Sequence, residues 1–118
     1  MITVRLKGIV VNELYDIEFS GDYVYIITEG HSGTGIKGED LVCAGVSSLT
    51  QSYIVAVSRV LKIRQDVAQR DGFLESAVAV GRLTGESLSM LKAVIGMVVA
   101  GLREIQALSP GSIEIIYE

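Results

Sequence analysis

YVYIITEGHSGTGIKGEDLVCA, residues 23–44, is the stretch that decides the fold of this 118-residue chain. Its opening part, residues 23–28, is rich in β-branched and aromatic side chains and predicts a strand. A glycine-rich segment follows, and from Leu41 onward apolar residues recur at roughly helical spacing. Asp40, directly before them, is a good N-cap. The stretch therefore predicts a strand, a loop and then a helix.

The rest of the chain predicts an α/β fold, in which two helices pack on a mixed, largely antiparallel β-sheet as a two-layer sandwich. We predict strands at about residues 2–11, 14–19, 23–30, 72–81 and 112–117, and a further short strand near 62–68. Helices are predicted at about 40–61 and 85–108. Thr84, Glu86 and Ser87 offer caps for the second helix, and the Ser-Pro-Gly of residues 109–111 ends it. We find no repeat or linker, so residues 1–118 predict a single domain.

Composition is typical of a small cytoplasmic protein. The chain is 49% hydrophobic and only 6% aromatic, which predicts a mostly aliphatic core. Its single cysteine excludes an intramolecular disulfide framework and fits a reducing compartment. The net charge of −4 argues against direct nucleic-acid binding. Residues 1–7 alternate like a strand and do not resemble a signal peptide.

One segment, residues 88–102, is apolar almost all round a helix. It is too short for a membrane span and carries Lys92, so we expect no membrane insertion. A helix that is apolar on both faces is buried against its own sheet and also suits a subunit interface. This pattern predicts a homodimer.

The only histidine and the only cysteine of the chain, His31 and Cys43, both lie in the opening stretch. A thiolate and an imidazole are the minimum for covalent catalysis by a cysteine enzyme. If Asp40 is the N-cap, Cys43 is the third helical residue, where the helix dipole favours the thiolate. The neighbouring carboxylates oppose this effect. The residues also have plain structural interpretations: Cys43 as a small core residue, His31 without chemistry, Asp40 as a cap and Ser47 as a small packing residue.

Residues 33–38 match the dinucleotide fingerprint G-x-G-x-x-G. The acidic residue expected about twenty positions later is missing, however, so we interpret these glycines as a loop beside the site. One histidine and one cysteine also cannot supply a zinc site with four protein ligands, and we expect no metal or cofactor.

The stretch resembles the signature of the ribosomal-processing cysteine proteases, abbreviated Prp. That signature is Gly-His, a short glycine-containing loop, Gly-x-Asp, an aliphatic pair, Cys-Ala, and a serine four residues after the cysteine. The matching residues here are Gly30-His31, Gly38-Glu39-Asp40, Leu41-Val42, Cys43-Ala44 and Ser47. Two departures stand out. Ser32 replaces the usual alanine, and residues 8–22 look longer than the family segment, which suggests an extra β-turn or hairpin near the active-site strand.

The resemblance implies that Cys43 is the nucleophile and His31 the base that later protonates the leaving amine. It places Asp40 near the active site, to orient His31, to cap the helix, or to do both. Ser47 would face the same side as Cys43, and Gly30 and Gly38 would support the site. The implied substrate is the N-terminal extension of a large-subunit ribosomal protein, cleaved after a pair of aromatic residues, and the implied assembly is a homodimer.

Two other functions remain open at this level. The chain could be a non-catalytic ribosome-associated or assembly-binding domain in which Cys43 is structural. It could also be a small thiol hydrolase or transferase that acts on a different acyl substrate. Thiol reactivity at neutral pH separates the first from a protease, and selectivity among peptides separates the second.

Overall fold

The computed structural model describes residues 1–30 and 37–118, with side chains for residues 1–30 and 41–118. The strands are β1 (Ile2–Lys7), β2 (Ile9–Val11), β3 (Ile17–Phe19), β4 (Tyr23–Glu29), β5 (Asp66–Arg70), β6 (Phe73–Ala79) and β7 (Ile113–Tyr117). The helices are α1 (Lys37–Val55), the π-helical turn η1 (Ala56–Val60) that continues it, and α2 (Gly85–Leu108).

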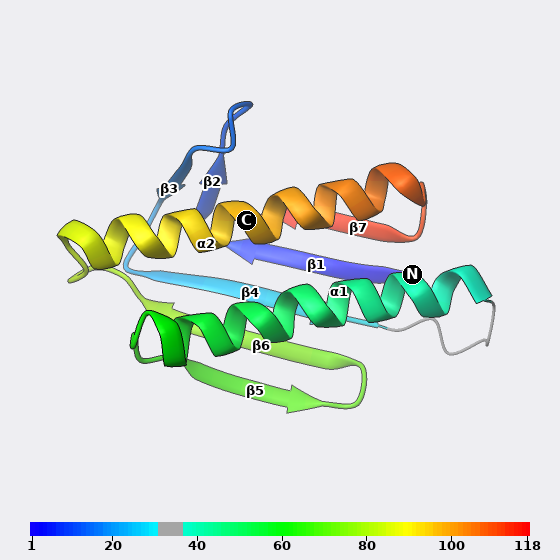
Figure 1. Cartoon of the computed structure of the whole chain (residues 1–118), viewed down its shortest axis with the longest axis horizontal. Helices are drawn as coiled ribbons and strands as arrows, with labels where there is room; N and C mark the ends of the chain where they lie inside the picture. Colours follow the sequence, from blue (N-terminus) through cyan, green and yellow to red (C-terminus); the bar gives the residue numbers. More distant parts are fainter. Residues whose placement is uncertain (31–36) are drawn as a thin grey trace.

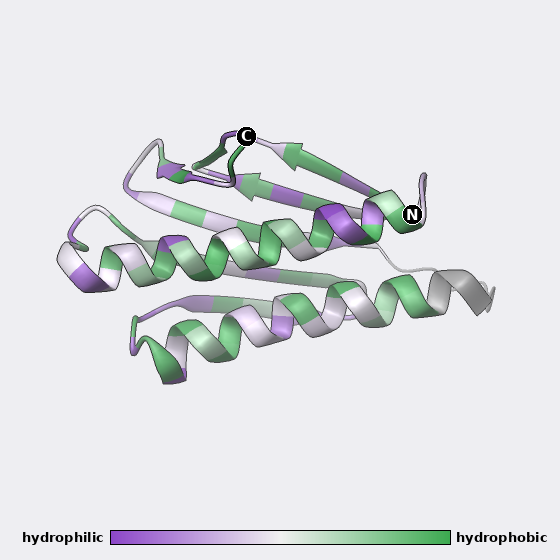
Figure 2. Ribbon diagram, turned by 45° about the horizontal axis from the view of Figure 1, so that its top comes forward, coloured by the Kyte–Doolittle hydropathy of each residue, from purple (hydrophilic) through white to green (hydrophobic). Residues whose placement is uncertain are grey.

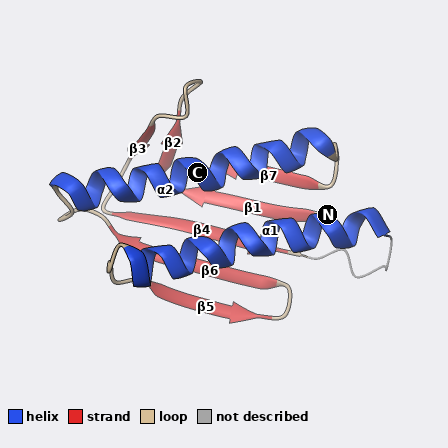
Figure 3. Cartoon of the chain, viewed as in Figure 1, coloured by secondary structure: helices blue, strands red, loops and turns tan. Residues whose placement is uncertain are grey.

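The elements form two layers. Five strands make one sheet in the order β5-β6-β4-β1-β7, and α1 and α2 both cover the same face of it (Figure 1, Figure 3). β1 and β7 run parallel, whereas β1 and β4, β4 and β6, and β5 and β6 pair antiparallel. The predicted two-layer α/β sandwich with a mixed, largely antiparallel sheet is therefore confirmed.

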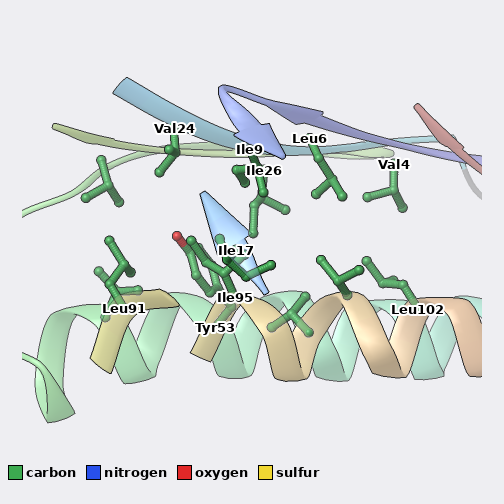
Figure 4. Close-up of a cluster of buried hydrophobic side chains, with 14 of the residues drawn as sticks. Val4, Leu6, Ile9, Ile17, Val24, Ile26, Tyr53, Leu91, Ile95 and Leu102 are labelled. Atoms are coloured by element: carbon green, nitrogen blue, oxygen red, sulfur yellow. The ribbon is translucent and has the colours of Figure 1, made fainter. Parts of the chain in front are cut away.

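The core lies between the sheet and the helices. Burial alternates along β1, which turns Ile2, Val4 and Leu6 toward the helices. The first helix buries one stripe at spacings of three or four residues, made of Val42, Val46, Thr50, Tyr53 and Val57. The second helix contributes Leu91, Ile95, Val98, Val99 and Leu102. Figure 4 shows the side chains of the two layers facing each other across this core.

The structure moves several predicted boundaries. The second helix spans the predicted residues, 85–108, but the first begins at Lys37 instead of residue 40 and ends in the π-helical turn. The short strand predicted near 62–68 lies at 66–70, because Lys62 takes a left-handed backbone (φ 56°) that turns the chain first. The predicted strand 2–11 is broken at Gly8, whose φ is +75°. A side chain there would collide with the Tyr23 carbonyl oxygen, so only glycine fits.

Beyond Gly8 the chain leaves the main sheet and forms the β2–β3 hairpin. The hairpin expected within residues 8–22 is therefore present. It packs on α2, where Gly96 brings the helix backbone close to Ile17. It leads into the start of β4, at the opposite end of that strand from Gly30 (Figure 1).

The two helices approach each other closely where glycines replace side chains. A Cβ at Gly101 would lie 2.8 Å from Leu49 Cδ1, and one at Gly45 would lie 3.1 Å from Ile105 Cδ1. Figure 2 shows that both helices carry long hydrophobic stretches. Residues Leu41–Val60 are apolar and long enough to cross a membrane. Their buried stripe against the sheet is equally the pattern of a core helix.

Candidate active site

Cys43 is the seventh residue of α1, since the helix begins at Lys37. Asp40 is the fourth helical residue, and its prediction as the N-cap is wrong. The favourable effect of a helix dipole is concentrated in the first turn. Cys43 lies beyond that turn, so the stabilisation of the thiolate expected from the third helical position does not apply.

The Cys43 side chain is partly buried, packs against the hydrophobic core and also lines a surface cavity of about 400 Å³. Three parts of the chain surround this cavity. They are the end of β4 with Gly30, one face of α1, and the turn between β5 and β6, residues 69–74. The cavity thus brings together Gly30, Cys43 and Ser47, three of the residues predicted for the site.

The other predicted residues stand differently. His31 lies outside the described residues. Gly38 and Asp40 belong to α1, but the position of the Asp40 side chain is also outside what the structure describes. The pairing of His31 with Cys43 therefore stays a prediction.

One face of α1 presents polar groups to the cavity. Cys43, Ser47 and Gln51 are spaced by four residues, so they lie on one side of the helix, and all three line the cavity. Thr50 beside them is buried and donates its hydroxyl to the Val46 carbonyl at 2.9 Å. Ser47 is exposed on this face. Close packing of the helices instead involves Gly45, so the interpretation of Ser47 as a packing residue is wrong.

Gly30 fixes the backbone at the end of β4. Its N–H donates to the Gly72 carbonyl at 2.9 Å, which ties β4 to the β5–β6 turn. Its φ is +89°, and a Cβ would lie 2.7 Å from the Met1 carbonyl oxygen. Both constraints require glycine. The residue next to His31 in the sequence is therefore held firmly beside the cavity.

Sequence reasoning missed the β5–β6 turn. Asp71 and Gly72 form a two-residue loop between strands, and Gly72 takes a φ of +70°. An Asp-Gly pair between two strand-like runs is a strong hairpin signal that could have revealed it. At this turn the Arg70 guanidinium lies 3.8 Å from the centre of the Phe73 ring. No comparable sequence signal marks Gln51 and Gln69, which face the cavity from α1 and β5.

These groups bring a thiol, hydroxyls and amides together in one cavity. The partly buried Cys43 lines the cavity, and hydroxyl and amide groups on α1 lie beside it. Among the residues with described side chains, we find no cluster of three or more His, Cys, Asp or Glu that could hold a metal ion.

The family model for the cysteine protease Prp matches residues 10–114. No curated protein matches the chain by sequence. The fold is similar to that of the Staphylococcus aureus ribosomal processing protease Prp in complex with a substrate peptide, with a TM-score of 0.73 and 21% identity over 100% of both chains. For the same protease in complex with a covalently linked product peptide, the TM-score is 0.71 and the sequence identity is 23% over 100% of both chains. For SMU.848 from Streptococcus mutans, the TM-score is 0.66 and the sequence identity is 20%, over 100% of this chain and 96% of that one.

Proposed function

Since this chain belongs to the Prp family of cysteine proteases, we propose that it removes the N-terminal extension of a large-subunit ribosomal protein, with a dyad of Cys43 and His31. The observation that carries the proposal is the shared cavity of Cys43 and Gly30, because His31 directly follows Gly30 in the sequence. The S. aureus protease of the same fold is a ribosomal processing protease, which supports this choice of substrate.

The chemistry proceeds in two steps. His31 takes the proton of Cys43, and the thiolate sulfur attacks the scissile carbonyl carbon. When the tetrahedral intermediate collapses, the C–N bond breaks, and His31 gives the proton to the leaving amine. Water then attacks the thioester carbonyl while His31 accepts a proton from it. The second tetrahedral intermediate collapses, the C–S bond breaks, the new carboxyl end of the product leaves, and the proton returns from His31 to the Cys43 sulfur. We propose that Asp40, which lies inside α1 and is not its cap, orients His31.

The proposal is tested by cleavage of a peptide that carries the extension of the organism's own ribosomal protein. Cys43→Ala and His31→Ala should each abolish cleavage, and the double variant should be no worse, because the two groups act as one unit. Cys43→Ser should be nearly inactive, since a hydroxyl is far less acidic than a thiol. Ser48→Ala, exposed on α1 but outside the cavity lining, is the matched control. Well-folded single variants that keep substantial turnover would exclude this mechanism.

Cys43 is partly buried and packs against the core. We propose that the native thiol reacts with iodoacetamide at neutral pH. If Cys43 reacts only after denaturation, it is a structural residue, and the non-catalytic domain is favoured. Cleavage of thioesters but not of peptides would instead favour a thiol hydrolase or transferase.

We also propose that the protein is a cytoplasmic homodimer. The outward side of α2 exposes Met90 and Met97, and Leu108 near its end is exposed as well. A second copy would cover this apolar surface. The single cysteine is compatible with a reducing compartment.

A further inference from the structure

β5 is an edge strand of the main sheet, paired on one side with β6. All five of its residues are exposed, so no other described part of the chain covers its outer edge. An uncovered edge carries backbone N–H and C=O groups that can pair with another extended chain.

The turn between β5 and β6 determines which groups point outward. Arg70 and Phe73 flank a two-residue loop, and such flanking residues exchange their backbone hydrogen bonds. Hydrogen-bonded and non-hydrogen-bonded pairs then alternate along an antiparallel ladder. The backbone N–H and C=O groups of Gln69 and Val67 therefore point away from β6, toward the open edge.

The open edge is continuous with the cavity of Cys43. Gln69 lines that cavity from β5, and Gln51 lines it from α1. At the other end of β5, Gln65 holds the strand to the first helix. Its Nε2 donates to the Ile54 carbonyl at 2.6 Å, and its Oε1 accepts from the Ser76 hydroxyl at 2.7 Å. Figure 1 shows β5 at the edge of the sheet, next to β6 and on the side away from β4.

We propose that the substrate peptide adds to the sheet as an extra strand beside β5, with its main chain bound by the outward groups of Gln69 and Val67. The inference rests on the proposed function for the identity of the peptide, but not for the mode of binding. Main-chain pairing gives affinity without reading sequence, and alternate side chains then reach the cavity. Because Gln69 belongs both to the edge and to the cavity, a peptide paired there passes directly to Cys43.

Gln69→Pro tests this mode of binding, because it removes an outward N–H and leaves the ladder to β6 intact. Gln69→Ala is the matched control, since it deletes the side-chain amide but keeps the N–H. We expect Gln69→Pro to raise KM about tenfold with little change in kcat, and Gln69→Ala to have a smaller effect. Circular dichroism and an unchanged rate of Cys43 alkylation verify that the variant is folded with an intact site.

Two peptide substrates separate this inference from the proposed function. One is the ribosomal extension peptide, and the other is a degenerate peptide mixture. A rise in KM for both substrates in Gln69→Pro, with kcat little changed, supports strand addition. If the wild type cleaves only the mixture, the proposed ribosomal substrate is excluded. The effect of Gln69→Pro on the KM for the mixture then still decides the binding mode. An unchanged KM in folded Gln69→Pro overturns the inference. So does a change of oligomeric state by light scattering, because β5 would then pair with a second copy.

Discussion

Because Gly30 has no side chain, its backbone can take the conformation that holds the end of β4 beside the cavity. We expect Gly30→Ala to lower the free energy of unfolding by about 1–3 kcal/mol, because its left-handed backbone disfavours a side chain and the Met1 carbonyl blocks the space. The reactivity of Cys43 should fall as well. Urea unfolding and iodoacetamide labelling measure the two effects. Gly21→Ala is the control, since a Cβ at Gly21 would meet no atom within 4 Å, and equal losses in both variants would contradict the argument.

Tyr53 makes stability sensitive to alkaline pH. Burial raises the pKa of its phenol well above the ordinary value of 10.0. Above about pH 10 the unfolded chain releases the phenolic proton, whereas the folded chain keeps it. The contribution of Tyr53 to the free energy of unfolding is therefore complete below pH 10 and declines as the pH rises above it. The free energy of unfolding should fall by up to about 1.4 kcal/mol per pH unit from this residue.

Tyr53→Phe should remove this part of the alkaline loss. Tyr23→Phe, at an exposed ring, should leave it in place. Denaturant unfolding of the three proteins between about pH 9 and about pH 11 makes the comparison. Parallel curves for the wild type and Tyr53→Phe would show that another group controls the transition.

Among the elements, the β2–β3 hairpin is held by Arg103 of α2. The guanidinium lies 5.0 Å from the Tyr15 ring centre and 5.5 Å from that of Tyr117, and its Nη2 donates to the Tyr117 hydroxyl at 2.7 Å. Arg103→Met should cost about 1–2 kcal/mol and speed hydrogen exchange across residues 9–19. Cleavage should be unchanged, because the hairpin joins β4 about 20 Å from Gly30. Exposed Arg82→Met is the control, and an equal loss there would exclude a specific clamp.

The elements also show how far the sequence could predict the structure. α2 was predictable because Thr84, one of the candidate caps, stands at its N-cap position and Ser-Pro-Gly follows it. The break at Gly8 was not, because the need for glycine comes from the carbonyl of Tyr23, fifteen positions away in sequence. The start of α1 was placed too late because apolar periodicity begins only at Leu41.

The part of the candidate site that lies on one helix was predictable, because the chain has a single cysteine and helical spacing fixes what lies beside it. Cys43 and Ser47 could be placed together from helical spacing alone. The β5–β6 turn came into the site through tertiary pairing of Gly72 with Gly30, which no local pattern reveals. The same is true of Gln69, whose side chain reaches the cavity from a different element.

For the whole molecule, the exposed methionines of α2 predict a dimer interface that a single charged residue should disrupt. Met97 is 56% exposed, and a charge there would be desolvated by a partner copy. Met97→Glu should convert a dimer to a monomer without unfolding the chain. Light scattering at micromolar concentration measures the mass, and Val10→Glu, at an exposed position on the hairpin, is the control. A wild-type mass equal to one chain would contradict the dimer.

The position of β1 between β4 and β7 has a consequence for the timing of folding. Thr3 pairs with Glu29 on one side and with Glu114 on the other. The first partner is close along the chain, whereas the second is synthesised more than a hundred residues later. Until β7 pairs with it, β1 is itself an open edge with unpaired backbone groups, and its apolar face carries Ile2, Val4 and Leu6. Distant partners are slow to meet, so a newly made or refolding molecule passes through an interval in which two such edges can join wrongly. We therefore expect the recovery of refolded protein to fall as its concentration rises, even though the finished sheet is unchanged.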